Sequence, residues 1–202
     1  MGRMIPVIPQ PQPAKFDEKV RKPGMAWLKK HNINLTVSLP SNTNPHPYWR
    51  ECLDDLHKSY KGICAYLAVY IERATGAVTT DHYIAKSANA GLTYEWSNYR
   101  LACMAMNARK RAFDDVLDPF TMPSDMFRLE LASGRIFVNP DITGNFVREA
   151  KLTIERLDLD SSINRDMRAR HFQDYALSSI NSEHLRKTSP FVWNEARRQG
   201  LL

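Results

Sequence analysis

The sequence predicts an α+β fold in which a few short strands lie within a mostly helical chain. Two observations favour this class. β-Branched and aromatic residues are concentrated in the segments 63–81, 98–103 and 126–138, a composition typical of strands. Elsewhere apolar residues recur at helical spacing, most clearly between Trp49 and Tyr60. Together these patterns predict a small β core with helices on either side of it in the sequence.

Residues 1–48 are predicted to form a proline-rich N-terminal arm and linker. The text "IPVIPQPQP" favours an extended chain over a helix in residues 1–14. The next stretch, "FDEKVRKPGMAWLKKHN", predicts a short helix interrupted by the Pro-Gly pair at 23–24. The text "TNPHPYW" then predicts irregular structure up to the next helix.

Residues 49–120 are predicted to form the core. A helix starting at Trp49 ends at Gly62, which is a suitable C-cap. The text "ICAYLAVYIERATGAVTTDHYIAKS" predicts a strand, a turn at Thr75-Gly76, and a second strand ending near Asp81. A loop, "ANAGLTYEWS", leads to a further strand, "NYRLAC". The helix "MAMNARKRAFDDVL" follows and is expected to stop before Pro119.

Residues 121–202 are predicted to form a hairpin and a helical C-terminal region. The text "MFRLELASGRIFV" predicts a hairpin that turns at Ser133-Gly134. Helices are expected from about 142 to 157 and from near Ser161. A last helix begins with Ser189 as N-cap and Pro190 at its first position.

Composition predicts a cytoplasmic protein without a membrane partner. No apolar run approaches the roughly 20 residues that cross a bilayer. The N-terminus lacks the apolar centre of a signal peptide. The three cysteines, Cys52, Cys64 and Cys103, are an odd and sparse set, which fits a reducing compartment better than a disulfide scaffold.

Positive charge predicts a polyanionic partner. The net charge is +6 and the sequence pI is about 9.3. Because basic surfaces bind nucleic acid by releasing its counterions, nucleic acid is the favoured partner, with DNA foremost. An ordinary solvated surface is the open alternative. The basic residues cluster at Lys15, Lys19, Arg21, Lys22, Lys29, Lys30, Arg109, Lys110, Arg111, Arg165, Arg168 and Arg170.

Four polar residues follow the predicted strand–loop–strand–helix order. Asp81 and His82 end the first strand, Asn98 opens the second, and Asn107 lies on the helix. A histidine of ordinary pKa accepts a proton from water at neutral pH. Carboxylate and amide oxygens are hard ligands suited to Mg²⁺ or Mn²⁺. A competing interpretation makes His82 a metal ligand with Asp81 as its hydrogen-bond partner.

The text "TTDHYIAKS…YEWSNYRLACMAMNARK", within residues 64–111, resembles the HNH endonucleases. The resemblance implies a ββα-metal HNH core embedded in a mostly helical domain. It also implies a metal-dependent endonuclease that hydrolyses phosphodiester bonds in DNA with one divalent metal, Mg²⁺ or Mn²⁺. His82 would be the general base, and Asp81 and Asn107 would hold the metal. Asn98 would complete the catalytic set by tying its strand to the Asp-His loop and keeping His82 oriented.

Basic residues beside this motif are expected to contact nucleic acid. They are Arg100, Arg109, Lys110 and Arg111, and a solvated helix face is the alternative for them. Many HNH proteins also hold a structural zinc with two Cys-x-x-Cys pairs, which here read Cys64 to Leu67 and Cys103 to Met106. Since two thiolates do not complete a tetrahedral site, no structural zinc is expected. A Cys3His site completed by Cys52 and His57 is the less favoured alternative.

The same stretch of sequence also resembles the small HNH proteins encoded beside an ATPase in bacterial anti-phage systems of the Septu and retron type. This resemblance implies a role in antiviral defence, an ATPase partner protein and a docking role for the C-terminal helices. Two alternatives stay open. One is a catalytically silent HNH-like module that binds nucleic acid, and the other is a subunit whose residues 140–202 serve mainly for assembly.

Overall fold

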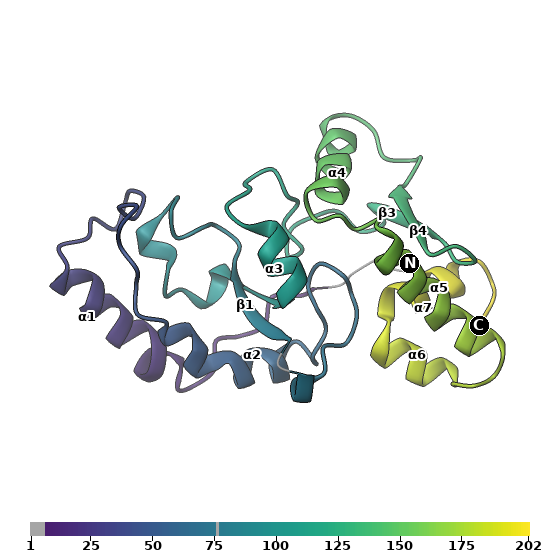
Figure 1. Cartoon of the computed structure of the whole chain (residues 1–202), viewed down its shortest axis with the longest axis horizontal. Coiled ribbons are helices and arrows are strands. Elements are labelled where there is room, and N and C mark those ends of the chain that lie inside the picture. The colour runs from purple at the N-terminus through teal and green to yellow at the C-terminus, as the bar shows by residue number, and fades with distance from the viewer. Residues whose placement is uncertain (1–6, 76) are drawn as a thin grey trace. The chain divides into compact units, whose positions relative to one another are not determined.

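The computed structural model describes residues 7–75 and 77–202 and has a mixed α+β architecture (Figure 1), as predicted. These residues divide into two compact units that alternate along the sequence. The site unit comprises Pro9–Gly62 and Ile71–Asp114, and the hairpin unit comprises residues 7–8, 63–70 and 115–202. The domain boundaries predicted from the sequence, at residues 48 and 120, stay a prediction. Residues 1–6 of the expected arm and Gly76 of the expected turn lie outside the described residues.

The site unit is built on a two-stranded antiparallel sheet. Strand β1 (Val78–His82) pairs with β2 (Tyr99–Cys103), and Asp81 lies opposite Arg100 while His82 lies opposite Tyr99. Helix α3 (Met104–Lys110) starts directly after β2 and packs against both strands. The expected strand–loop–strand–helix order is therefore confirmed in this segment.

The N-terminal helix of the site unit is continuous, which corrects the expected interruption at Pro23-Gly24. A π-helical turn (Asp17–Arg21) runs directly into α1 (Lys22–Lys30). The proline lies in the first turn of α1, where its ring is tolerated. A Cβ on Gly24 would lie 2.2 Å from Cγ of Tyr94, so only glycine allows the helix to approach this ring.

The helix before the sheet was predicted with its correct C-cap. A 3₁₀ turn (Tyr48–Cys52) leads into α2 (Leu53–Ser59). Gly62 has a φ of 72° and its N–H donates to the carbonyl oxygen of His57 at 2.8 Å. This left-handed conformation ends the helix as glycine C-caps do. Shorter 3₁₀ turns cover Arg73–Thr75, Ala90–Leu92 and Trp96–Asn98.

The prediction of a strand before Thr75-Gly76 is wrong. Residues 63–70 belong to the hairpin unit and make one isolated bridge, between Ile63 and Tyr70. The chain turns back on itself because Ala68 has a φ of 49° and hydrogen bonds join Cys64 to Ala68 and to Val69. Most of the segment is buried. Its strand-like composition therefore reflects burial rather than pairing.

Helix α3 is shorter than predicted. It ends at Lys110, whereas the sequence pattern predicts a helix continuing to about residue 118. Arg111 has a φ of 46° and a ψ of −127°, which no α-helix accommodates. The buried side chain of Lys110 at this point bonds to the loop after β1, a long-range contact that a local pattern does not contain.

The hairpin unit contains the predicted hairpin. Strand β3 (Phe127–Glu130) pairs with β4 (Arg135–Val138) in an antiparallel register. Gly134 in the turn has a φ of +69°, and a Cβ there would lie 2.0 Å from the carbonyl oxygen of Arg165. Both the left-handed backbone and the close contact require glycine.

Four helices complete this unit, and the C-terminal pattern predicts three of them, all but the one at Ser182–Thr188. They are α4 (Asn145–Arg156), α5 (Ser162–Ala176), α6 (Ser182–Thr188) and α7 (Pro190–Arg198). Ser189 occupies the N-cap position of α7 without a capping side-chain bond, and Pro190 lies in its first turn. Within residues 7–75 and 77–202, every helix is too short or too polar to cross a membrane.

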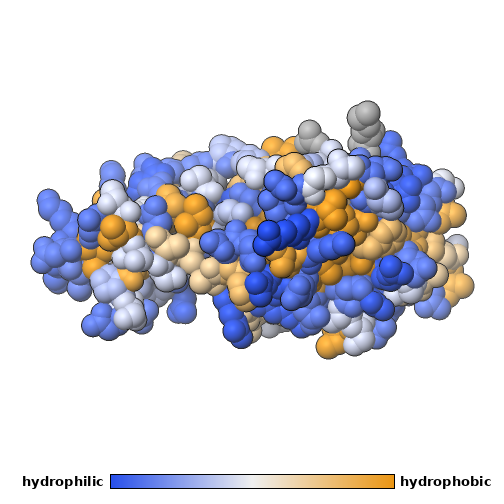
Figure 2. Space-filling model, turned by 90° about the horizontal axis from the view of Figure 1, so that it is seen from above, coloured by the Kyte–Doolittle hydropathy of each residue, from blue (hydrophilic) through white to orange (hydrophobic). Residues whose placement is uncertain are grey.

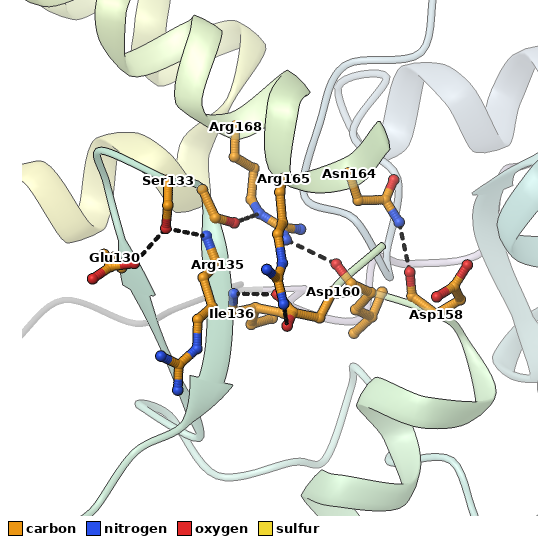
Figure 3. Close-up of polar contacts among 11 residues, drawn as sticks. Glu130, Ser133, Arg135, Ile136, Asp158, Asp160, Asn164, Arg165 and Arg168 are labelled. Atoms are coloured by element: carbon orange, nitrogen blue, oxygen red, sulfur yellow. Dashed lines mark hydrogen bonds and ion pairs between the residues drawn. The ribbon is translucent and has the colours of Figure 1, made fainter. Parts of the chain in front are cut away.

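A polar network attaches α5 to the hairpin (Figure 3). The buried guanidinium of Arg168 donates to the carbonyl oxygens of Gly134 at 2.7 Å and Leu159 at 2.8 Å. Asp160 accepts from the N–H of Ile136 at 2.9 Å and from Nε of Arg165 at 2.9 Å. Because these bonds satisfy the carbonyl of Gly134 in the hairpin turn and the N–H of Ile136 on β4, α5 and the hairpin stabilise each other.

Candidate active site

A pocket of about 320 Å³ lies at the end of β1 in the site unit. Asp81 and His82 line it from β1, and Asn107 lines it from α3. Lys86 and Arg111 add two cationic groups to its wall. Adjacent residues on a strand diverge, but here the strand ends at His82, and both neighbouring side chains border the same pocket. Three of the four residues predicted as a catalytic set are therefore brought together.

His82 is held in one orientation by the loop between β1 and β2. Its Nε2 lies 2.9 Å from the carbonyl oxygen of Thr93, and its ring packs edge-on against Trp49 and Tyr99. Since a carbonyl oxygen only accepts, Nε2 carries the hydrogen and Nδ1 carries the lone pair. Burial, and then the charge of Lys86, lower the pKa of His82 to about 3. The imidazole is consequently neutral at neutral pH, but a pKa this far below the ordinary value expected from the sequence makes it a weaker base than an ordinary histidine.

Asn98 does not line the pocket, but it connects the loop segments that hold His82. Its amide oxygen accepts from the N–H of Ile84 at 2.8 Å. Its amide nitrogen donates to the carbonyl oxygens of Ile84 at 3.0 Å and Leu92 at 3.1 Å. Leu92 precedes Thr93, the partner of His82. These contacts join the chain just after β1 to the loop that carries Thr93.

The side-chain amide of Asn107 donates from its nitrogen to β1, which leaves its oxygen available to a ligand. Its Nδ2 donates to Oγ1 of Thr79 at 3.1 Å and to the carbonyl oxygen of Thr80 at 3.4 Å. Because the nitrogen is used in this way, the amide oxygen is the atom left for a ligand in the pocket. The buried carboxylate of Asp81 lines the same pocket near Lys86. Burial lowers the pKa of Lys86, and the charge of Asp81 partly offsets that effect.

The donor set of the pocket fits a hard divalent cation. A carboxylate and an amide oxygen, from Asp81 and Asn107, are ligands that Mg²⁺ and Mn²⁺ prefer, and Mg²⁺ commonly keeps several waters and binds substrate phosphate. In the described part of the chain, no group of three or more histidine, cysteine, aspartate or glutamate side chains could hold a metal. A metal bound here would complete its coordination with water and substrate.

The expected phosphate contacts of Arg100 and Lys110 need correction. Both side chains are buried against the ring of Tyr83. Arg100 donates to the carbonyl oxygens of Ser97 at 2.8 Å and Tyr99 at 3.1 Å, while Nζ of Lys110 donates to that of Tyr83 at 2.8 Å. Their charges thus serve the backbone of the loop rather than a ligand.

The other two predicted basic residues are more accessible. Arg109 is half-exposed on α3, and Arg111 is exposed and lines the pocket. Of the four predicted nucleic-acid contacts, only Arg111 lies at the pocket itself.

Two features of the site were missed in the sequence. Lys86 belongs to the motif text "TTDHYIAKS", and its place four residues after His82 was the available signal. The second is the segment 39–45, whose irregular, proline-containing text carried no signal, although it forms a wall of the pocket. Hydrogen bonds attach the chain before it to the β1–β2 loop, from Ala90 to Val37 and from Gly91 to Leu35. This wall therefore comes from the part of the chain predicted to be a linker.

The cysteines have other partners and environments. Cys64 and Leu67 lie in the hairpin unit, whereas Cys103 and Met106 lie in the site unit. The thiol of Cys52 donates to the carbonyl oxygen of Trp49 at 3.2 Å, and burial together with the charge of Asp55 raises its pKa to about 12. Nε2 of His57 lies 2.9 Å from the carbonyl oxygen of Ile71. Cys52 and His57 are thus engaged with backbone groups.

Comparisons with known proteins assign no family to this chain. No family model matches its sequence, and a search of the curated proteins finds no match. The functional interpretation therefore depends on the side chains of the pocket and on the chemistry that they allow.

Proposed function

We propose that this chain is a metal-dependent endonuclease of the HNH type that hydrolyses phosphodiester bonds in DNA. One observation carries the proposal. The pocket at the end of β1 joins a neutral, backbone-oriented imidazole, His82, with two hard oxygen ligands, Asp81 and Asn107. Phosphodiester hydrolysis requires a base for water and a cation for the phosphate in the same place.

His82 acts as the general base in this proposal. With its hydrogen on Nε2 donated to Thr93, its Nδ1 accepts a proton from the attacking water. Asn98 keeps this orientation by holding the loop that presents the Thr93 carbonyl. A base with a fixed orientation lowers the entropy lost in reaching the attack geometry.

Asp81 and Asn107 hold the divalent metal, Mg²⁺ or Mn²⁺. Such a cation, when bound, neutralises charge on the phosphate and on the leaving 3′ oxygen. Arg111 and Lys86 border the same pocket and neutralise the remaining phosphate charge. The expected products carry a 5′-phosphate and a 3′-hydroxyl.

The proposal extends, through the sequence resemblance alone, to an effector of antiviral defence with an ATPase partner in the cytoplasm. A catalytically silent module that only binds nucleic acid or a partner is the alternative. The same experiment separates the two, because a silent module has no need of His82.

The test is cleavage of supercoiled plasmid with Mg²⁺ or Mn²⁺ by the wild type, His82→Ala and His184→Ala. His184 is an exposed histidine of the hairpin unit and serves as the matched control. We expect His82→Ala to cut 10²–10⁴-fold more slowly, the range for a lost general base, and His184→Ala to cut at the wild-type rate. Circular dichroism checks that each variant is folded. Equal cleavage by wild type and His82→Ala would exclude His82 as the base, and no cleavage by any of them would favour the silent module.

A further inference from the structure

The N-terminal helix of the site unit and the turn directly before it carry five exposed lysines that the active-site proposal does not use. We call them the lysine face; they are Lys15, Lys19, Lys22, Lys29 and Lys30. Figure 2 shows mainly hydrophilic residues over the part of the site unit that carries α1. Among the residues that the structure describes, none of the five forms an ion pair.

The opposite side of this helix is fixed in the core. Phe16, Val20, Gly24 and Leu28 recur every four residues and are buried. An α-helix has about 3.6 residues per turn, so residues four apart drift around it. The π-helical turn before α1 holds more residues per turn and offsets that drift, so the four buried residues stay on one side. Since the apolar side is packed inside the unit, the lysine face is directed to solvent.

The neighbouring charges leave the lysine face strongly positive. Arg21, the other basic residue of the helix, is engaged with Asp17 at 2.8 Å and Glu95 at 2.7 Å. Arg21 therefore offsets one of these two carboxylates, and Glu18 is the other acidic residue of the segment. With Arg21 and Glu95 counted, six positive and three negative charges leave a net charge of about +3 on this surface of the same unit as the pocket.

The length of the lysine face suits a polynucleotide. From Lys19 to Lys30 the helix rises about 16 Å, at about 1.5 Å per residue. Phosphates of one DNA strand follow one another every 3.4 Å along the duplex axis. The face is therefore longer than a single small anion and can contact several phosphates of one duplex.

We propose that the lysine face binds the phosphate backbone of the nucleic acid that the pocket cuts, and that it supplies sequence-independent affinity outside the pocket. The identity of the ligand as the enzyme's own substrate rests on the proposed nuclease function. A lipid surface fits less well, because an interfacial helix inserts its apolar face into the bilayer. Here that face is buried in the protein core.

Salt dependence of DNA binding tests this proposal. Binding of a fluorescent DNA duplex is measured by anisotropy with EDTA present, so that no cleavage occurs, from 50 to 300 mM salt. The variant is Lys19→Gln/Lys22→Gln/Lys30→Gln, and glutamine keeps the helix propensity of lysine. Each lost phosphate contact lowers the slope of log K against log salt by about 0.9. We expect a slope smaller by 2 to 3 and affinity at least about tenfold weaker at 0.1 M salt.

The matched control removes three positive charges from the hairpin unit. Arg148, Lys151 and Arg170 are exposed there, and Arg148→Gln/Lys151→Gln/Arg170→Gln changes the net charge equally. We expect this control to bind DNA as the wild type does. Equal weakening by both triple variants would show a general charge effect and overturn the proposal.

The outcomes for the lysine face and for the nuclease are separable. Plasmid cleavage with Mg²⁺ tests the nuclease, whereas binding in EDTA tests the lysine face. An unchanged salt slope in the lysine variant, or wild-type protein that does not bind DNA, would overturn the lysine face whatever the cleavage result. Wild-type protein that binds anionic phosphatidylserine vesicles instead of DNA would overturn it as well.

Discussion

The imidazole Nε2 of His82 lies 2.9 Å from the carbonyl oxygen of Thr93, in the loop between β1 and β2. The hydroxyl of Tyr99 donates to the same oxygen, also at 2.9 Å. Asn98 holds the carbonyl of the preceding residue, Leu92. The orientation of the candidate base therefore depends on a loop that two residues of the second strand region hold in place.

Replacing Asn98 tests this dependence. Asn98→Ala removes three hydrogen bonds and leaves the carbonyl oxygens of Ile84 and Leu92 without this donor. We expect the free energy of unfolding to fall by about 2–4 kcal/mol, because each unsatisfied buried group costs 1–3 kcal/mol. Urea unfolding followed by circular dichroism measures the change. A variant as stable as the wild type would contradict this role of Asn98.

Two replacements of Asn107 distinguish the role of its amide oxygen from that of its amide nitrogen. Asn107→Ala loses the oxygen ligand and the bond to Thr79, whereas Asn107→Asp keeps an oxygen and loses only the donor. We expect Asn107→Ala to raise the Mg²⁺ concentration for half-maximal cleavage by about tenfold or more, in line with the loss of an oxygen ligand. Asn107→Asp should lie nearer the wild type. Identical Mg²⁺ dependence in all three proteins would show that Asn107 does not hold the metal.

The cysteines should differ in reactivity. Cys52 and Cys64 are buried, Cys103 is half-exposed, and the pKa of Cys52 is raised to about 12 by burial and by Asp55. Because the thiolate is the reactive form, native protein should react rapidly at Cys103 alone with a disulfide reagent. Unfolded protein should react at all three cysteines. Rapid reaction that persists in Cys103→Ser would disprove this assignment.

We expect the half-buried His171 to lower the free energy of unfolding at acid pH. Burial, and then the charge of Arg170, lower its pKa below the ordinary value of 6.5, and its Nδ1 has no hydrogen-bond partner among the described residues. As the pH falls through 6.5, the unfolded chain takes up a proton that the folded protein does not, so stability falls with falling pH. The contribution cannot exceed about 1.4 kcal/mol per pH unit.

His171→Leu isolates this contribution. We expect the difference in unfolding free energy between pH 7.5 and pH 5.5 to be smaller in the variant than in the wild type. His82 acts in the same direction in both proteins, because its pKa is also lowered. An equal or larger difference in His171→Leu would assign the acid sensitivity to other groups.

The sequence by itself determined the elements whose signals are local. The strands around Asp81 and after Asn98 were predicted from β-branched and aromatic composition, and the hairpin was predicted from Ser133-Gly134. Gly62 as a C-cap and Pro190 in a first turn were predicted from backbone preferences. Such features follow from a few neighbouring residues, whose dihedral and side-chain preferences act over one or two turns.

Only the tertiary structure decided which charges face solvent and which segments border the pocket. Arg100 and Lys110 look like surface cations in the sequence, but packing against Tyr83 buries both of them. The segment 39–45 reaches the pocket through contacts with a loop more than 40 residues later in the chain. Burial and long-range pairing depend on the sum of many weak contacts between distant residues, and no single stretch of sequence contains that sum.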